Sequence, residues 1–235
     1  MKKKLRILAI IPARAGSKGV QDKNIKPLNG KPLLAWTVLE AKKLGFLDCI
    51  HVSTDSKKYA AVAVRYGADV SFLRPRKLAL DGSRVGDTLL FVLKQFELMG
   101  REFDLIVSLP PTTPLRNATD IRNAFELLFK KDAQGVVSVC ETDYHPLWCN
   151  TLNKNLSMKN FLRPGIEHKN RQELPKYYRL NGAIYLAYCD FLKKNRSFYG
   201  PRTYAYIMPK ERSVDINERI DFAFAESLMR SQKRK

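Results

Sequence analysis

The alternation of short apolar runs with longer helix-like stretches constrains the fold of this chain more than any other feature of its sequence. The apolar runs predict buried strands, and the segments between them predict helices. The predicted strands span residues 5–11, 48–54, 69–73, 104–109 and 134–140. The predicted helices span residues 32–44, 56–66, 86–99 and 119–131. This order is typical of an α/β fold with a mostly parallel sheet and helices on both faces.

Three of the predicted strands are followed by loops rich in glycine, proline, serine, threonine and basic residues. These loops span residues 14–23, 74–83 and 110–116. In sheets of this class, ligands bind beyond the carboxyl ends of the strands. We therefore expect the three loops to line one binding site.

The first of these loops has the chemistry of a polyphosphate-binding segment. Gly16 and Gly19 allow backbone N–H groups to approach an anion, and basic side chains supply positive charge. These basic residues are Arg14, Lys18 and Lys23. The spacing fits neither the P-loop nor the Gly-x-Gly-x-x-Gly dinucleotide fingerprint. A solvated turn in a lysine-rich protein is the alternative interpretation of this loop.

The pattern changes after the fifth predicted strand. Residues 142–178 show no helical period and are predicted to form an inserted arm or small subdomain. Two further strands, at 180–186 and 203–208, and a last helix near the C-terminus are predicted to complete the fold. The sequence thus predicts one nucleotide-binding domain, built from residues 1–141 and 179–235, with the arm inserted into it.

The net charge of +19 indicates an attraction for anions such as nucleotides, nucleic acids or acidic membranes. Eight of the basic residues lie at the two chain ends, which leaves +11 for the remainder of the chain. These eight are Lys2, Lys3, Lys4, Arg6, Arg230, Lys233, Arg234 and Lys235. The other basic residues are dispersed and no nucleic-acid-binding motif is visible, so nucleic-acid binding is only the second hypothesis.

Cysteines, histidines and apolar runs exclude other classes. The four cysteines form no Cys-x-x-Cys pair and the three histidines are scattered, so a zinc site is not expected. The cysteines are expected to be reduced, several of them buried. No apolar run approaches the ~20 residues of a membrane helix, and no signal peptide is recognisable. We therefore expect a cytoplasmic protein.

Six separated segments carry more specific motifs. The first is Pro-Ala-Arg-x-Gly-Ser-Lys-Gly at 12–19, followed by Lys-Asn at 23–24. The others, in chain order, are 52–56, 73–75, 111–116, 171–175 with 181–185, and 214–216. Together they resemble, in the same order, the motifs of the CMP-sialic acid synthetases, also called acylneuraminate cytidylyltransferases. The resemblance covers the chain nearly from end to end.

The resemblance implies a Rossmann-like sheet with a small projecting domain that is exchanged across a homodimer. It also implies an activity, in which CTP is coupled to a nine-carbon 2-keto acid sugar to give the CMP-sugar and pyrophosphate, with Mg²⁺ as cofactor. The anomeric hydroxyl of the sugar would attack the α-phosphate of CTP. The protein would contribute mainly positioning and charge neutralisation.

The resemblance also assigns roles to residues. The positions that would hold the triphosphate are Arg14, Ser17, Lys18 and Lys23. Among these, Lys23 is expected to stabilise charge at the α-phosphate, with catalytic support from Arg14 and Lys18. The positions that would face cytidine are Asn24, Arg74, Asp81 and Ser83. The sugar would be contacted by Arg171, Gln172 and Tyr185, in part across the dimer, and Mg²⁺ would be held by Asp215 and Asn217.

Two positions depart from the family pattern. Members that use N-acetylneuraminic acid typically carry Gln where this chain has Pro110, so legionaminic and pseudaminic acids become candidate substrates. The family's Asp-Ile-Asp metal motif ends here in Asn217, which brings no negative charge. A synthetase for the eight-carbon sugar 3-deoxy-manno-octulosonate is the alternative among enzymes. For Asp215, capping of the last helix is the alternative role.

Overall fold

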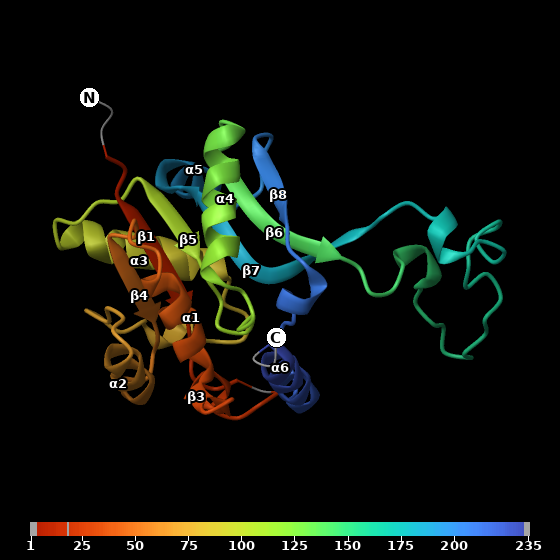
Figure 1. Ribbon diagram of the computed structural model, residues 1–235, viewed down its shortest axis with the longest axis horizontal. Helices are drawn as coiled ribbons and strands as arrows, with labels where there is room; N and C mark the ends of the chain where they lie inside the picture. Colours follow the sequence, from red (N-terminus) through yellow and green to blue (C-terminus); the bar gives the residue numbers. More distant parts are fainter. Residues whose placement is uncertain (1–3, 18, 233–235) are drawn as a thin grey trace.

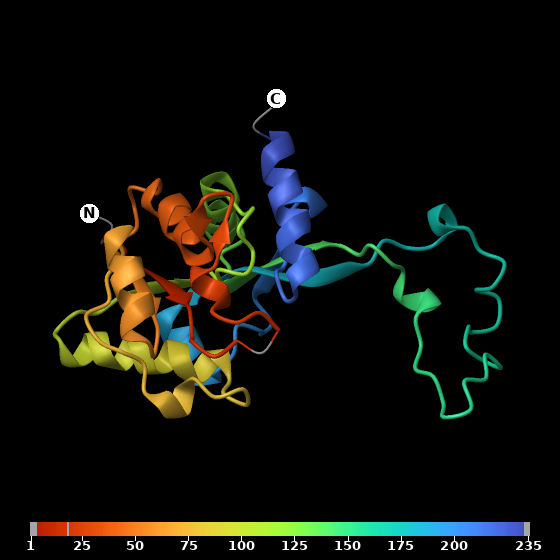
Figure 2. The same ribbon diagram turned by 90° about the horizontal axis from the view of Figure 1, so that it is seen from below.

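The computed structural model describes residues 4–17 and 19–232, which form a body built on one six-stranded sheet and an arm that projects from it (Figures 1 and 2). The strands follow the order β4-β1-β5-β7-β6-β8. Their bounds are β1 (Ile7–Pro12), β4 (Cys49–Ser53), β5 (Leu105–Ser108), β6 (Gly135–Glu141), β7 (Tyr178–Tyr188) and β8 (Thr203–Ile207). Only β7 runs antiparallel to its neighbours in this sheet. The expected mostly parallel α/β sheet is confirmed.

Helices cover both faces of the sheet. One face carries α1 (Leu33–Lys42), α2 (Lys57–Arg65) and α4 (Ala118–Lys130). The other face carries α3 (Val85–Leu98) and the short α5 (Cys189–Asn195), which the sequence pattern did not predict. The last helix, α6 (Arg219–Gln232), packs beside the small hairpin of β2 (Pro27–Leu28) and β3 (Lys31–Pro32). Among the described residues, no helix is long and apolar enough to cross a membrane.

Strand β1 shows why the first apolar run is continuous rather than alternating. Ile7, Ala9 and Ile11 belong to the core under α1 and α4. Leu8 and Ile10 belong to the core under α3 and α5. Because a central strand is buried on both faces, every residue along it must be apolar.

The predicted strand at residues 69–73 is wrong. A single bridge between His51 and Asp69 is all the pairing that this segment makes with β4. The Asp69 carboxylate accepts hydrogen bonds from the backbone N–H of Ser71 at 3.3 Å and from its hydroxyl at 2.5 Å. An aspartate that bonds to the backbone two residues on favours a turn, which competes with strand pairing.

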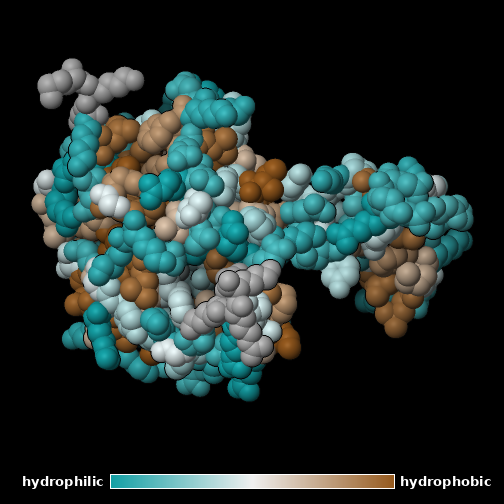
Figure 3. All heavy atoms as spheres, in the orientation of Figure 1, coloured by the Kyte–Doolittle hydropathy of each residue, from teal (hydrophilic) through white to brown (hydrophobic). Residues whose placement is uncertain are grey.

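Residues 142–177 form the arm, which leaves the body at the end of β6 and returns into β7 (Figure 1). Apart from two short 3-10 turns, Pro146–Trp148 and Arg171–Glu173, it has no helix or strand. The space-filling view shows it standing clear of the body (Figure 3). Three of the four cysteines are buried in the body, and Cys149 in the arm is exposed. The expectation that several cysteines are buried is confirmed.

Candidate active site

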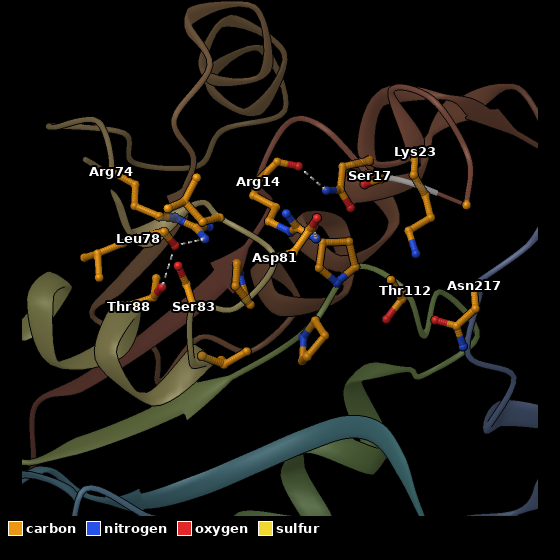
Figure 4. A pocket seen from close by; sticks show the side chains of 17 residues that line it. Arg14, Ser17, Lys23, Arg74, Leu78, Asp81, Ser83, Thr88, Thr112 and Asn217 are labelled. Carbon is orange, nitrogen blue, oxygen red and sulfur yellow. Dashed lines mark hydrogen bonds and ion pairs between the residues drawn. The ribbon is translucent and has the colours of Figure 1, made fainter. Parts of the chain in front are cut away.

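The three loops predicted to converge do so around one cavity, here called the main cavity, with a volume of about 610 Å³ (Figure 4). Because β1 and β5 are adjacent and parallel, the loops that follow them lie at the same edge of the sheet. The residues of the three loops that line the main cavity include Arg14, Ser17, Gly19, Lys23, Arg74, Asp81, Ser83, Pro110 and Thr112. Asn24 and Asn217 line it as well. Lys18 lies outside the described residues.

Arg14 joins the first loop to the second. Its guanidinium donates to the carbonyl oxygen of Ala79 at 3.0 Å and forms an ion pair with Asp81 at 2.7 Å. The backbone of Arg14 is held in turn by Asn24, whose side-chain amide donates to the Arg14 carbonyl at 3.0 Å. Asn24 therefore holds the backbone of the loop in place and also lines the main cavity.

Arg74 is a buried arginine and not a plain surface residue, since only 7% of it is exposed. It donates to the carbonyl oxygens of Ser53 and Leu78, which ties the second loop to the end of β4. Burial lowers the pKa of Arg74 to about 10, so the guanidinium is still a cation at neutral pH. Its Nε is buried and has no partner among the described residues.

Lys23 connects the first loop to the segment before α6. Its ammonium group donates to the carbonyl oxygen of Ile216 at 2.8 Å. Burial lowers the pKa of Lys23, while the negative charge of Asp215 opposes that shift. The loop and the segment touch at Gly19, where a Cβ atom would lie 2.5 Å from the carbonyl oxygen of Asn217. Only glycine permits this close approach.

Asp215 lies two residues before Asn217, which lines the main cavity. Its Oδ2 accepts a hydrogen bond from the side-chain amide of Asn217 at 3.1 Å. Asp221, the third residue of α6, accepts hydrogen bonds from the backbone N–H groups of Asn217 and Glu218, both at 2.8 Å, as the acid of a capping box does. Among the described residues, the Asp215 carboxylate bonds to the Asn217 side chain and to no backbone N–H of this helix. The alternative role of Asp215 as the helix cap is therefore wrong.

The carboxylate of Asp215 fits Mg²⁺ only as one ligand among several. The described residues contain no cluster of three or more histidine, cysteine, aspartate or glutamate side chains suited to a metal ion. Mg²⁺ is commonly held by one or two carboxylates together with substrate phosphates. The donor set here suits a metal that arrives with a nucleotide.

A second, smaller cavity of about 290 Å³, here called the side cavity, adjoins the main cavity. Val85, Pro110 and Thr112 line both cavities, so the two share part of their walls. The side cavity is also lined by Gly86, Ser108, Gly182, Tyr185, Phe198 and Asp215. Of the three predicted sugar contacts, Tyr185 lies here.

The other two predicted sugar contacts lie elsewhere. Arg171 and Gln172 line a cavity of about 410 Å³ within the arm, here called the arm cavity. Arg171 donates to the carbonyl oxygen of Thr142 at 3.3 Å and lies 3.9 Å from Glu141. None of the described residues that line the arm cavity also lines the main or the side cavity. A single chain therefore does not bring the arm residues together with the rest of the predicted site.

Sequence reasoning missed several residues of the site. Thr88 lines the main cavity, Thr112 lines both cavities, and Ser108 lines the side cavity. Thr112 carried a signal, because it lies in a proline-rich loop that follows a strand. Ser108 carried a weaker one, as a polar residue at the end of an apolar strand. Thr88 carried none, since one threonine in a helix is unremarkable.

Comparison with known proteins gives concordant results. A family model described as "Cytidylyltransferase" matches residues 8–234. The chain is 40% identical to a CMP-N,N'-diacetyllegionaminic acid synthase of Legionella pneumophila, over 96% of this chain and 97% of that protein. It is 35% identical to an N-acylneuraminate cytidylyltransferase of Escherichia coli, over 97% of this chain but 53% of that longer protein.

The fold is similar to that of a solved CMP:2-keto-3-deoxy-manno-octonic acid synthetase complexed with CTP. The TM-score is 0.71, and the match covers 97% of this chain and 99% of the other at 15% sequence identity. At this identity the likeness supports the fold alone.

Proposed function

The chain belongs to the cytidylyltransferase family, and we propose that it transfers CMP from CTP to a nine-carbon 2-keto acid sugar of the sialic acid type. The observation that carries this proposal is the convergence of three cationic side chains in one cavity beside a second, less polar cavity. The three are Arg14, Lys23 and Arg74. A triphosphate would occupy the main cavity, and an acceptor sugar would occupy the side cavity.

The proposed reaction is a substitution at the α-phosphorus of CTP. The anomeric hydroxyl oxygen of the sugar forms a bond to this phosphorus, and its proton passes to solvent water. The bond from the α-phosphorus to the bridging oxygen of the β-phosphate breaks, and pyrophosphate leaves with that oxygen. Lys23 would stabilise the charge that develops on the α-phosphate, and Arg14 and Ser17 would hold the outer phosphates.

We propose Mg²⁺ as the cofactor, held by Asp215 together with the phosphates of CTP. When bound, the metal would neutralise part of the triphosphate charge. Asn217 orients the Asp215 carboxylate through its amide hydrogen bond at 3.1 Å. Its own amide oxygen would be a neutral ligand or hold a metal-bound water.

The positions of Arg171 and Gln172 lead us to propose a homodimer. These residues lie in the arm, away from the side cavity of their own chain. In a dimer that exchanges arms, they would reach the acceptor bound to the partner subunit. Because CTP is an intracellular nucleotide, we also propose a cytoplasmic location.

The test is release of pyrophosphate, measured with each of the four nucleoside triphosphates and a panel of 2-keto acid sugars. The panel would contain N-acetylneuraminic, diacetyllegionaminic, pseudaminic and 3-deoxy-manno-octulosonic acids. We expect a clear preference for CTP and for nine-carbon acceptors. Equal rates with all four nucleotides, or activity restricted to the eight-carbon acid, would contradict the proposal.

A further inference from the structure

The place of Lys23 in the first loop depends on the residue before it. Asp22 has left-handed backbone angles, φ 52° and ψ 30°, which are unfavourable for most residues and tolerated best by glycine, asparagine and aspartate. Its carbonyl oxygen accepts hydrogen bonds from the backbone N–H groups of Ile25 and Lys26, both at 3.0 Å, and so begins the 3-10 turn Lys23–Ile25. Because adjacent Cα atoms lie about 3.8 Å apart, the placement of Asp22 sets where the Lys23 side chain starts.

The Asp22 side chain is bound by two successive residues of α2. Its Oδ2 accepts a hydrogen bond from the Lys58 ammonium group at 2.9 Å, and its Oδ1 accepts one from the Tyr59 hydroxyl at 3.0 Å. These two bonds lower the pKa of Asp22, so it is a carboxylate at neutral pH. The helix α2 contributes Ala63 to the core of the body, and the turn is therefore attached to a fixed element.

The two partners of Asp22 differ in how firmly they can hold it. The side chain of Lys58 is 66% exposed, and an exposed ion pair of this kind contributes little. Only 1% of Tyr59 is exposed, and its buried hydroxyl needs a hydrogen-bond partner, which Asp22 provides. Burial and the Asp22 carboxylate raise the pKa of Tyr59, so the hydroxyl keeps its proton and donates. The bond from Tyr59 is the one that fixes Asp22.

The Lys23 side chain is held at its other end as well. Its ammonium group donates to the carbonyl oxygen of Ile216 at 2.8 Å, and Figure 4 shows the side chain extending into the main cavity. A chain of contacts thus leads from α2 through Tyr59, Asp22 and Lys23 to the segment before α6. Neither Asp22 nor Tyr59 lines the main cavity, so both can act on a bound nucleotide only through Lys23.

We propose that Asp22 and Tyr59 are positioning residues for Lys23, and that the hydrogen bond between them holds the turn so that the ammonium group faces the α-phosphate. This inference rests on the proposed function, because it takes Lys23 as the residue that stabilises charge there. A misplacement of about 1 Å, caused far from the reacting atoms, can reduce a rate by up to roughly 10²-fold. A hydroxyl that never touches substrate can therefore control turnover.

The first test is Tyr59→Phe, which removes the hydroxyl and keeps the buried ring. We expect kcat to fall roughly tenfold, with the KM values for CTP and the acceptor changed by less than about twofold. In the Lys23→Ala background the same substitution should cause no further fall, because no ammonium group is left to position. A tenfold fall in that background too would overturn the inference.

Asp22→Gly tests the other partner of the bond. Glycine adopts left-handed backbone angles without strain, so this variant removes the carboxylate but does not oppose the turn. We expect the same fall in kcat, and no additional fall when Asp22→Gly is combined with Tyr59→Phe. Normal turnover of Asp22→Gly, or additive effects in the double variant, would show that the bond does not act as a unit and would overturn the inference.

Tyr206→Phe is the matched control. The Tyr206 hydroxyl also donates to an aspartate, Asp120 at 3.2 Å, and Tyr206 lines neither the main nor the side cavity. This variant should keep the kcat of the wild type. A fall as large as that of Tyr59→Phe would mean that the loss of any tyrosine–aspartate bond is sufficient, which would contradict a role specific to Lys23.

The second test needs no substrate. Hydrogen exchange of the backbone N–H groups of Ile25 and Lys26, measured by NMR, reports how firmly the turn is held. We expect exchange to be several-fold faster in Tyr59→Phe than in the wild type or Tyr206→Phe. Unchanged exchange would overturn the inference whether or not the enzyme turns over. A wild type that releases no pyrophosphate with any acceptor would instead refute the proposed function, so the two failures are distinguishable.

Discussion

The main cavity and the arm cavity both contain arginines assigned to substrates, but they hold them differently. Arg74 in the main cavity is 7% exposed and donates to two backbone carbonyls. The side chain of Arg171 in the arm is 54% exposed and has one long hydrogen bond and one distant ion pair. The main cavity is thus preorganised within one chain, whereas the arm residue is free to change its partners.

The two proposed substrate sites therefore differ in how firmly a single chain holds their residues in place. The residues around the main cavity are fixed by contacts that span the chain, such as the bond from Lys23 to Ile216. The residues that line the main cavity all come from one chain, so the proposed nucleotide site needs no partner. The arm contributes no residue to the buried apolar clusters of the described chain. In the proposed dimer its polar residues would serve the acceptor site of the partner subunit, and four variants test this contrast.

Asp215→Asn should have the largest effect, because it removes the carboxylate that we assign to Mg²⁺. This carboxylate lies beside the preorganised main cavity. We expect turnover to fall by roughly 10³-fold at saturating CTP. Pyrophosphate release measured across a range of Mg²⁺ concentrations checks this. Asp190→Asn is the control: Asp190 lies in the first turn of α5 and lines neither the main nor the side cavity, so the variant should keep normal turnover and the normal Mg²⁺ requirement. An active Asp215→Asn enzyme with normal Mg²⁺ dependence would leave the metal assignment without support.

Lys23→Ala should reduce turnover by roughly 10²-fold, because it removes a cation from the reacting phosphate. Folding should be intact, as measured by circular dichroism, and Lys57→Ala, on the exposed start of α2, should be fully active. Near-normal activity would exclude Lys23 from the mechanism.

The pH dependence of turnover gives a second readout for Lys23. Burial lowers the pKa of this lysine, and only its protonated form is a cation. Activity that depends on the cation is present below the lowered pKa and is lost as the pH rises through it. We expect the alkaline loss to begin at a lower pH than for an ordinary lysine. In Lys23→Arg, whatever activity remains should persist to higher pH.

Arg171→Ala should raise the KM for the acceptor sugar by roughly tenfold and leave the KM for CTP unchanged, since the arm is not part of the main cavity. Mixing this variant with Lys23→Ala tests whether the arm serves a partner. If arms are exchanged, mixed dimers contain one intact site, and about a quarter of all sites recover at equal amounts of the two chains. No recovery after co-expression would show that the arm acts within its own subunit.

Asn217→Asp should have the smallest effect. It adds a carboxylate beside Asp215, which should lower the Mg²⁺ concentration for half-maximal rate a few-fold, with little change in the maximal rate. The titration that serves Asp215→Asn measures it. An unchanged or increased Mg²⁺ requirement would place Asn217 outside the metal site and confine that site to Asp215.

The sequence by itself determined the architecture of the body. The alternation of apolar runs and helical patterns predicted the bounds of ten strands and helices to within two residues, because local periodicity reports which faces of an element are buried. It also placed the three site loops at one edge of the sheet. The motifs within those loops identified the family. The predicted nucleotide-binding residues that the structure describes line one cavity.

Tertiary structure decided what local patterns do not encode. The segment 69–73 bends after its single bridge at Asp69, where the Asp69 carboxylate bonds to Ser71, although its composition suits a strand. Asp215 and Asp221 are both acidic residues near the start of α6, and only their contacts show that Asp221 bonds to the backbone there while Asp215 bonds to the Asn217 side chain. Tyr59 became notable only when its buried hydroxyl was found to donate to Asp22. Such roles arise from contacts between residues far apart in the chain, which no local period of the sequence records.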